Sequence, residues 1–459
     1  MLRHSRVKAR SPLTCWSRRT APAIAILVLI LLPGAGRAQQ GGDNLPQVTI
    51  AQSPIPPGTV ITMQNWQQYK NYMQAGLQAF FSGKYRWKFP PDVQLVIGHT
   101  HHYPVPTQFV LDTQRYSKLV KIVTLPDGGH KLEGYVAGLP FPNPTEPDMG
   151  WKLLMDMYYA YACPLECAHD TFYIRDRFGS TSTETLQEVQ FRLTHLSVPG
   201  KPVNDPRAHG IYESSSLQLR SPEQVKYLTN LSIHYDDPSK PPDTFLFIPS
   251  LRRSLRLSTA AQCSPVAGSD LFQTDAFRSN FNGDPSIFNG RFLRDGYDLI
   301  QMKANLKNLA NLNDLYNPLL FPKPSVGKFE VRPVWVLDLR RIPSRRAGFC
   351  YGKEIFYVDK DDYSALWVDA YDVNMKLWKP MMVNQFLRFI PGVGESLVGQ
   401  QWTDFLWDME NAHLTAAMAT DVNGTPRGFN EQCAPWIDGV NYDDVARYGL
   451  SSGLSEILR

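Results

Sequence analysis

Four consecutive residues, His99-Thr100-His101-His102, form the densest cluster of potential metal ligands in the chain. On a strand, His99 and His101 would share one face, an arrangement that suits a metal ion. No acidic or cysteine ligand lies near them in the sequence, and Pro104 and Pro106 interrupt regular structure directly afterwards. Because this ligand set is incomplete, we predict neither a metal site nor a cofactor here.

Short catalytic motifs are weak or missing. Asp359-Lys360-Asp361-Asp362 begins like a calcium loop but lacks the glycine at the sixth position and the glutamate at the twelfth, so a hairpin turn is the better interpretation. The sequence contains no Gly-x-Ser-x-Gly elbow, no His-Glu-x-x-His pair and no phosphate-binding glycine loop. These absences lower the expectation of an enzyme without excluding one, because catalytic groups often come together from distant positions.

A basic segment from Leu251 to Leu257 is the most distinctive polar motif. In an extended conformation its odd-numbered residues share one face, and Arg252 and Arg256 share the other. These two arginines are candidates for binding an anionic headgroup or the carboxylate of a partner. The alternative is an ordinary solvated strand face, since most surface charges serve solubility.

Six cysteines are present, and Cys15 lies within the N-terminal export signal described below. An odd number remains in the exported part, where one or two disulfides and a leftover thiol are the default. Cys163 and Cys167 are close enough in sequence to be candidates for a local disulfide. A Cys-x3-Cys pair without a histidine at ligand spacing is a poor zinc site. The connectivity of Cys263, Cys350 and Cys433 cannot be read from their spacing.

The middle and end of the chain predict strands. The clearest runs from Val225 to Tyr235, where apolar residues at odd positions alternate with mainly polar ones. Residues 329–339 alternate in the same way around Pro333, which argues for an edge or a bulge there. Further strands are expected at 189–194, 244–248, 252–257, 353–359 and 365–371, the last two as a hairpin around a polar turn.

Three segments predict helices that must bury an apolar stripe. In the first, apolar residues recur at three- and four-residue steps from Trp66 to Phe80, and Gly83 ends it. The other two are residues 149–161 and 402–418.

Long, one-sided and consecutive strands fit a mainly β (α+β) fold: a large, curved, open antiparallel sheet, or half-barrel. Its concave face must be filled by helices, by a ligand or by both, so we expect the helices to pack in or over it. The candidate groove residues are Tyr227, Leu231 and Ile233, with Trp335 and Leu337 opposite, and Arg252 and Arg256 for a polar headgroup.

The N-terminus has the three parts of a secretory signal. Residues 1–20 hold six basic and no acidic side chains, residues 21–32 are almost continuously apolar, and Gly36-Arg37-Ala38 offers small residues to a signal peptidase. The apolar stretch is shorter than the roughly 20 residues of a membrane span. We therefore expect a signal peptide at 1–38, cleaved near Ala38, and a periplasmic location. A flexible lead-in at 39–57 and a single β-rich domain at 58–459 are expected to follow.

Removal of the signal changes the charge. The full chain has 47 basic and 43 acidic residues, but residues 1–38 hold seven of the basic ones and no acidic one, which leaves a net charge of −3. A mildly acidic mature chain does not support nucleic-acid binding. An aromatic content of 12% and 36 prolines favour a β-rich body with many turns.

Several short stretches together resemble one protein family. They are Gly138-Leu-Pro-Phe-Pro142, Asp243 to Pro249 running into Arg252-Arg253-Ser-Leu-Arg-Leu257, Gly268-Ser-Asp270, Phe329-Glu-Val-Arg332 with Trp335, and Phe356-Tyr-Val-Asp359 leading to Asp369-Ala-Tyr-Asp372. In this order they are similar to the exported Gram-negative family catalogued as domain of unknown function 1329 (DUF1329), from about Pro57 to the C-terminus. The segment from Ala160 to Cys167, with its paired cysteines, departs from the family pattern.

That family resembles the outer-membrane lipoprotein-sorting proteins in fold, and its members often occur alongside outer-membrane barrel proteins and exporters of the resistance-nodulation-division class. The resemblance implies a periplasmic binder or carrier of a lipid or other hydrophobic molecule that serves outer-membrane transport or assembly, with such a barrel or exporter as partner. It implies no reaction and no catalytic residues. Two alternatives stay open: an envelope enzyme acting on an apolar substrate, and an assembly partner of a barrel or exporter that binds no small ligand.

Overall fold

The computed structural model describes residues 53–458 apart from residues 104, 238, 277, 303–311, 385–386, 391–393, 398–402 and 421–439. The expected signal peptide at 1–38 and most of the expected lead-in at 39–57 lie outside the described residues, as does Cys433. Within the described part, no helix is long and apolar enough to cross a membrane.

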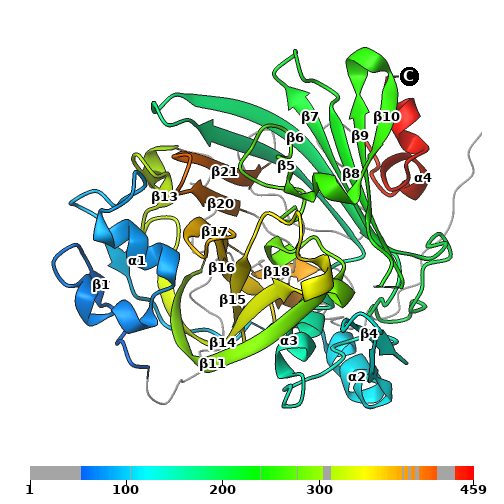
Figure 1. The fold of residues 1–459 in the computed structure, drawn as a ribbon, viewed down its shortest axis with the longest axis horizontal. Coiled ribbons are helices and arrows are strands. Elements are labelled where there is room, and N and C mark those ends of the chain that lie inside the picture. Colours follow the sequence, from blue (N-terminus) through cyan, green and yellow to red (C-terminus); the bar gives the residue numbers. More distant parts are fainter. Residues whose placement is uncertain are drawn as a thin grey trace, which may run out of the picture. The chain divides into compact units, whose positions relative to one another are not determined.

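Thirteen antiparallel strands form one large curved sheet that does not close on itself (Figure 1). Their spatial order is β10-β9-β8-β7-β6-β5-β21-β20-β17-β16-β15-β14-β11. The predicted mainly β, open antiparallel fold is therefore confirmed. The strands of this sheet are β5 (Leu165–Arg175), β6 (Thr181–Arg192), β7 (Ile211–Ser221), β8 (Thr229–Tyr235), β9 (Asp243–Ile248), β10 (Arg253–Leu257), β11 (Phe288–Gln301), β14 (Phe329–Arg341), β15 (Lys353–Asp359), β16 (Ala365–Tyr371), β17 (Leu377–Asn384), β20 (Thr403–Asp408) and β21 (His413–Thr420).

The remaining elements are short. The α-helices are α1 (Ala75–Ser82), α2 (Thr107–Tyr116), α3 (Met149–Tyr158) and α4 (Val445–Tyr448). Two-stranded pairs join β1 (Val60–Ile61) to β2 (Leu95–Val96), β3 (Lys121–Thr124) to β4 (His130–Glu133), β12 (Leu315–Tyr316) to β13 (Phe321–Pro322) and β18 (Leu387–Ile390) to β19 (Gly394–Leu397). Single 3-10 turns are η1 (Trp66–Gln68), η2 (Lys70–Tyr72), η3 (Ser117–Leu119), η4 (Pro249–Leu251), η5 (Thr259–Cys263), η6 (Arg278–Asn280), η7 (Pro285–Ile287), η9 (Leu312–Asp314), η10 (Pro343–Arg345) and η11 (Gly453–Glu456).

Helix α3 fixes the direction in which the sheet curves. Near its start, Gly150 lies against the backbone of Gly290 in β11, at one edge of the sheet. At its end, the carbonyl of Tyr158 accepts a hydrogen bond from the hydroxyl of Tyr212 in β7 (3.2 Å), and the Tyr158 hydroxyl lies 3.4 Å from Nδ1 of His234 in β8. A helix of this length spans about 15 Å, whereas the ten strand spacings from β8 to β11 would span about 48 Å in a flat sheet. The sheet therefore wraps around α3, and the face that α3 covers is concave.

The convex face is covered by the N-terminal and C-terminal segments. In one half of the sheet, Phe80 of α1 and the nearby Trp87 pack against Trp367 of β16 and Trp407 of β20. Asp369 of β16 accepts a hydrogen bond from the backbone N–H of Gly76 (3.0 Å) and so holds the first turn of α1 on the sheet. In the other half, α4 packs against β5 to β9. Both faces of the sheet are thus largely buried by the chain's own segments.

Most predicted strands are found, and two of the predicted helices are corrected. Residues 353–359 and 365–371 form β15 and β16, and residues 149–161 contain α3. Residues 402–418, predicted to be a helix, instead form the hairpin of β20 and β21. The run is apolar on both sides because Phe405 and Trp407 pack on the convex face and Leu406 on the concave face, and a doubly buried strand lacks a clear period.

The first predicted helix is also shorter than expected. Residues 66–72 form two 3-10 turns, and the α-helix begins only at Ala75. The apolar side chains in this region still pack on the sheet, so the periodicity indicated the buried side correctly but not the backbone conformation.

The disulfide pattern differs from the predicted local pair. Cys263 and Cys350 form a disulfide across 87 residues. Cys167 is also disulfide-bonded, but Cys163 is a buried thiol, so the two are not joined to each other. Strand β5 begins between them, and their side chains enter different clusters of the core, Cys163 on the concave side and Cys167 on the convex side. The chain between them therefore does not turn back tightly enough for a disulfide.

The close contact between α3 and β11 gives a first prediction. A Cβ atom at Gly150 would overlap the carbonyl oxygen of Gly290. We expect Gly150→Val to push α3 away from the sheet and to lower the free energy of unfolding by about 2 kcal/mol, measured by urea denaturation. Lys152→Val, on the same helix, is the control for the helix propensity of valine. Equal losses in the two variants would contradict the packing explanation.

Candidate functional site on the concave face

Residues 264–287, here called the crossing segment, run across the concave face from one half of the sheet to the other. The disulfide from Cys263 to Cys350 fixes the start of this segment. The polar contacts along its path are Asn230 Nδ2 of β8 to Gln273 Oε1 (2.8 Å), Asp270 N to Thr415 Oγ1 of β21 (2.9 Å), Lys379 Nζ of β17 to the Asp270 carbonyl (2.6 Å) and Ala365 N of β16 to Ser279 Oγ (3.1 Å). Together with α3, the crossing segment fills the middle of the concave face.

Beside this filled region, one row of side chains crosses from β6 to β10 on the concave face. In the strand register, Glu188 of β6 pairs with Leu217 of β7, Leu217 with Asn230 of β8, Asn230 with Leu246 of β9, and Leu246 with Leu255 of β10. Directly paired residues point to the same face of a sheet. We call these five residues the leucine row. Asn230 is buried, Glu188, Leu217 and Leu246 are half-buried, and Leu255 is 44% exposed, so the row becomes accessible to solvent toward β10.

A group of carboxyl side chains lies at the polar end of the leucine row. Asp170 of β5 and Glu188 hydrogen-bond to each other through their side chains, and Asp404 of β20 is close enough to interact with Asp170 electrostatically. Burial raises the pKa of Asp170 to about 6. Loss of hydration and then the charge of Asp170 raise the pKa of Glu188 and of Asp404 well above their ordinary values. Burial thus favours the neutral form of Glu188 and Asp404, and a neutral carboxyl can donate as well as accept hydrogen bonds.

A group of aromatic side chains lies where the end of α3 meets β6 and β7. The rings of Tyr158 and Tyr212 stack with centroids 5.5 Å apart, and Tyr159 meets Tyr212 edge to face at 5.3 Å. Arg192 of β6 pairs with Glu213 of β7 (3.3 Å), and its guanidinium lies 5.0 Å from the centroid of the Tyr212 ring. These contacts hold the end of α3 against β6 and β7.

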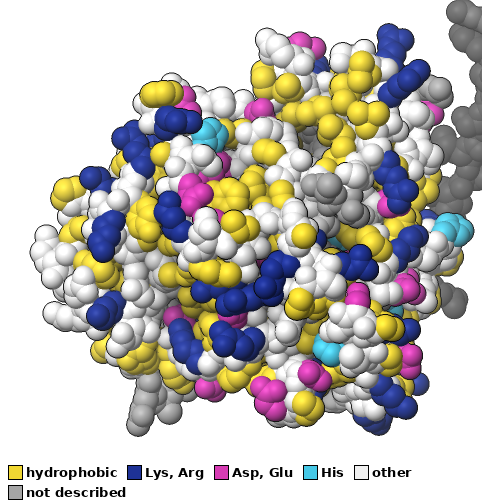
Figure 2. Space-filling view, in the orientation of Figure 1, with side chains coloured by type: hydrophobic (Ala, Val, Ile, Leu, Met, Phe, Trp, Pro, Cys, Tyr) yellow, Lys and Arg dark blue, Asp and Glu magenta, His cyan; other side chains and the backbone are white. Residues whose placement is uncertain are grey.

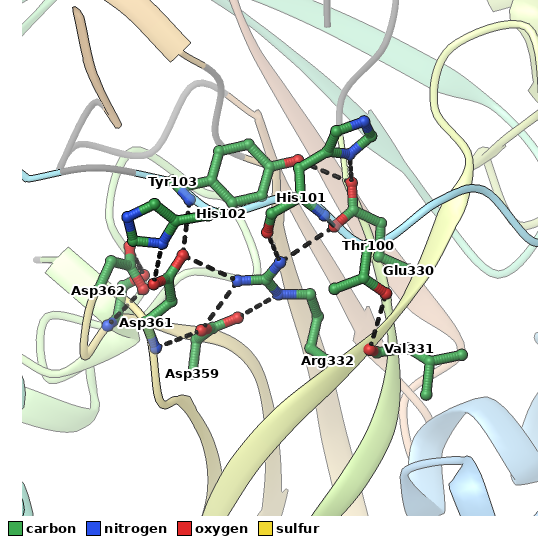
Figure 3. Close-up of polar contacts among 11 residues, drawn as sticks. Thr100, His101, His102, Tyr103, Glu330, Val331, Arg332, Asp359, Asp361 and Asp362 are labelled. Carbon is green, nitrogen blue, oxygen red and sulfur yellow. Dashed lines mark hydrogen bonds and ion pairs between the residues drawn. The ribbon is translucent and has the colours of Figure 1, made fainter. Parts of the chain in front are cut away.

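A second polar centre lies where β14 meets the turn after β15 (Figure 3). Arg332, which is 2% exposed, binds Asp359 through two nitrogens, Nε to Oδ2 at 2.6 Å and Nη2 to Oδ1 at 3.1 Å. Its Nη1 donates to Glu330 Oε2 at 3.1 Å and to the backbone carbonyl of His101, and Nη2 reaches Asp361 at 3.5 Å. One buried guanidinium thus joins three carboxylates and the histidine segment.

The histidine segment docks onto the same carboxylates. His101 Nδ1 lies 2.7 Å from Glu330 Oε1, and the Tyr103 hydroxyl donates to the same oxygen at 2.7 Å. His102 Nδ1 lies 2.6 Å from Asp361 Oδ1, and the backbone N–H of Tyr103 donates to Asp361 Oδ2 at 2.6 Å. The two motifs that the sequence suggested separately, at 99–102 and 359–362, therefore meet in space, and we call this arrangement the Arg332 network.

The electrostatics of the Arg332 network favour a fixed cation at its centre. Burial alone would lower the pKa of Arg332, but the charges of Asp359 and Glu330 raise it well above the ordinary value. Burial, and then the charge of Glu330, raises the pKa of Tyr103. The guanidinium occupies the position between carboxylates that a metal ion would need. Among the described residues, no three His, Cys, Asp or Glu side chains are arranged to hold a metal ion.

The family model described as a protein of unknown function (DUF1329) matches residues 60–433. The chain belongs to the DUF1329 family. This confirms the resemblance inferred from the short motifs. The DUF1329 protein described here is 22% identical over 341 residues to an uncharacterized protein of Pseudomonas aeruginosa, across 70% of this chain and 68% of the relative.

Two solved structures are similar to this DUF1329 protein at low sequence identity. One is a putative outer membrane lipoprotein-sorting protein domain from Vibrio parahaemolyticus, with 14% identity, coverage of 59% of this chain and 90% of that chain, and a TM-score of 0.41. The other is a DUF1329 family protein from Desulfovibrio piger, with 14% identity, coverage of 60% and 92%, and a TM-score of 0.42.

The structure does not bring the predicted groove residues of the DUF1329 protein together. Leu231 and Ile233 face the convex side, where they pack in one cluster with Val445 of α4. Trp335 and Leu337 face the concave side, in the cluster that contains α3. Because the two pairs lie on opposite faces of one sheet, they cannot line a single groove.

The other three predicted residues lie near the open end of the sheet. Tyr227 precedes β8 in a turn with φ +69°, so the predicted strand from Val225 begins four residues late. Arg252 has φ +50° at the end of η4 and is not part of β10, whereas Arg256 lies on β10 and pairs with Asp243. The two arginines are exposed, but they do not share one strand face as predicted.

Sequence reasoning missed the residues that line the accessible concave surface. Asn230 belongs to the polar side of the predicted strand at 225–235, Leu246 lies in the predicted strand at 244–248, and Leu255 lies in the predicted strand at 252–257, whose candidate site residues were Arg252 and Arg256. The available signal was the two-residue alternation itself, which separates the two sides of each strand. The polar side of β8 is buried and contacts the crossing segment.

Proposed function

We propose that this DUF1329 protein binds and carries a lipid or another hydrophobic molecule in the periplasm, in the service of outer-membrane transport or assembly. The observation that supports this best is the leucine row, which offers two half-buried leucines and the exposed Leu255 on the concave face of an otherwise well-filled sheet. The exposed part of such leucines gains free energy when an apolar ligand covers it. The expected export signal supports the location.

The dimensions of the row suit an acyl chain. Leu217 and Leu255 lie three strand spacings apart, which is about 14 Å. One leaflet of the hydrocarbon core of a bilayer is about 15 Å thick. The polar end at Glu188, with its neighbour Asp170, can hydrogen-bond to a headgroup while the apolar end follows the leucines. An amphiphile laid along the row therefore finds a matching partner at both ends.

We test ligand binding at Leu246, because this leucine lies between Asn230 and Leu255, in the part of the row that leads to the exposed end. We expect the mature protein to bind a dansyl-labelled fatty acid, and Leu246→Glu to weaken that binding by about tenfold, or about 1.4 kcal/mol. Fluorescence titration measures the affinity. Native mass spectrometry of the purified mature protein shows whether a lipid is carried from the cell.

Leu293→Glu is the matched control, because Leu293 is exposed on β11 at the far edge of the sheet. It introduces the same charge at a similarly exposed leucine and should leave the affinity for the probe unchanged. Absence of co-purified lipid together with no probe binding by the unmodified protein would overturn the proposed function. Equal weakening by both variants would remove the leucine row as its site.

A further inference from the structure

The outer edge of β10 is open for pairing. Within the described chain, no backbone group of Arg253–Leu257 forms a hydrogen bond beyond the ladder with β9. The register with β9 is unbroken, and the strand contains no proline, so it lacks two of the usual devices that block an edge. The side chains of Arg253 to Arg256 are all exposed.

The opposite edge of the sheet, β11, is protected. Its register with β14 shifts between Phe292 and Arg294, which marks a bulge. Its charges are matched internally, and the ion pairs are Arg291 with Asp338, Arg294 with Asp298 and Asp295 with Lys360. The two edges of one sheet are thus built differently, and of the two only β11 is interrupted by a bulge.

Positive charge and apolar surface accompany the open edge. Arg252 and Arg253 form no ion pair with the described residues, and Arg256 is paired with Asp243 alone. Leu251 is 57% exposed and Leu255 is 44% exposed. Figure 2 shows hydrophobic and basic side chains gathered over the end of the sheet where β9 and β10 lie. The C-terminal turn η11 packs on the convex side through Leu454 and leaves these side chains uncovered.

We propose that β10 is a docking edge for a partner protein, which adds an extended strand with acidic side chains beside Arg252 and Arg253 and an apolar side chain opposite Leu255. Strand addition satisfies the unpaired backbone groups of β10. Arg253 and Leu255 share one face of β10. The acidic side chains at one end of the added strand neutralise the two arginines through charge-assisted hydrogen bonds, and an apolar side chain further along the same face covers Leu255. An anionic membrane surface would use the arginines and leucines but would leave the backbone edge unpaired.

The docking edge adjoins the leucine row, which ends at Leu255. A strand added to β10 therefore lies beside the row, at the open end of the sheet. The proposal does not depend on the carried ligand, because it rests on the backbone, charge and exposure of β10 alone.

Two synthetic peptides of about ten residues, the length of a long strand, serve as probes. Both are rich in valine, and one carries glutamates near one end where the other carries lysines. At low ionic strength we expect the glutamate peptide to bind about tenfold more tightly than the lysine peptide. We also expect it to slow amide hydrogen exchange in residues 253–257 but not in β11. Isothermal titration and residue-resolved hydrogen exchange measure the two effects.

Arg252→Glu/Arg253→Glu should reverse the preference between the two peptides. Lys84→Glu/Arg177→Glu changes the net charge equally at two exposed positions remote in sequence, and it should leave the preference intact. Ser254→Pro removes a backbone donor from β10 and should weaken binding of the glutamate peptide without touching the arginines. The fatty-acid affinity of the arginine variants should be unchanged, which separates this proposal from the proposed function.

Any of three results would overturn the proposal: equal binding of the two peptides, protection of amides elsewhere than in β10, or an arginine variant that behaves like its control. Binding of β10 to vesicles with anionic lipid, without binding of the glutamate peptide, would also overturn it in favour of a membrane surface.

Discussion

Arg332→Met is expected to lower the free energy of unfolding by about 3 to 5 kcal/mol, the cost of breaking a buried ion network from one side. The variant leaves Glu330 and Asp359 buried without a countercharge. It also removes the hydrogen bond to the carbonyl of His101, which holds the histidine segment on the sheet. Urea denaturation followed by tryptophan fluorescence measures the loss.

Lys360→Met is the matched control, because Lys360 lies between Asp359 and Asp361 in the chain and forms a more exposed ion pair with Asp295. Its loss should stay below about 1 kcal/mol, as for other surface ion pairs. Arg332→Lys should recover part of the stability, because lysine keeps the charge but cannot bind Asp359 through two nitrogens. If Arg332→Met is as stable as Lys360→Met, the Arg332 network does not clamp the histidine segment.

The second large effect expected is a gain in stability on mild acidification. Burial raises the pKa of Asp369 and of Asp275 to about 6, and the same holds for Asp284 and Asp298. A carboxyl with a raised pKa stabilises the folded state below its unfolded pKa, and this contribution is lost as the pH rises through its folded value. Burial likewise raises the pKa of Asp170 to about 6 and that of Asp362 to about 7. We expect the free energy of unfolding to fall by about 6 kcal/mol between about pH 5 and about pH 8, roughly 1 kcal/mol for each of the six groups.

Carboxyls whose pKa is lowered in the folded protein do not cancel this effect. Hydrogen bonds from Arg207 lower the pKa of Asp205, and those from His195 lower the pKa of Asp236. Such groups lose their contribution only when the pH falls through their own folded pKa, below the window in question. His413, whose pKa is raised by its hydrogen bond to Asp270, acts in the same direction as the buried acids.

Substitution of the buried acids tests the assignment. Asp369→Asn/Asp275→Asn removes two of these six titrations and should reduce the pH dependence by about a third, as measured by thermal or urea unfolding across the pH range. Asp237→Asn, at an exposed position, should leave the slope unchanged. If the free energy of unfolding of the unmodified protein did not change between about pH 5 and about pH 8, burial of these acids would not control its stability.

Local pattern was sufficient for much of the sheet. The hairpin at 353–359 and 365–371 has the predicted bounds because two apolar segments flank a polar turn of three residues. Pro333 lies where the ladder between β14 and β15 ends, since β15 pairs with β14 only from Val334 onward, and the Pro333 carbonyl accepts a hydrogen bond from the backbone N–H of Lys360 (3.0 Å). In contrast, residues 402–418 were assigned the wrong element, because a strand buried on both faces shows no period.

The candidate site was harder to predict than the fold. An apolar side of a strand predicts burial, but it does not say which layer buries it. Leu231 and Ile233 were expected to line a groove, yet the C-terminal helix α4 covers them. The concave side of the same strand holds Asn230 and its neighbours, which are polar because the crossing segment provides hydrogen-bond partners there.

The sequence by itself determined the family, the open antiparallel β class and most strands of the sheet, because alternation, turns and short motifs are local properties. Only the tertiary structure decided what the His99–His102 cluster does. Its acidic partners, Glu330 and Asp361, lie more than 200 residues away in the chain, and only strand pairing brings them and Arg332 to it. A cluster that looked like an incomplete metal site is completed by a guanidinium, since a buried group of carboxylates requires a cation and the fold supplies one from β14.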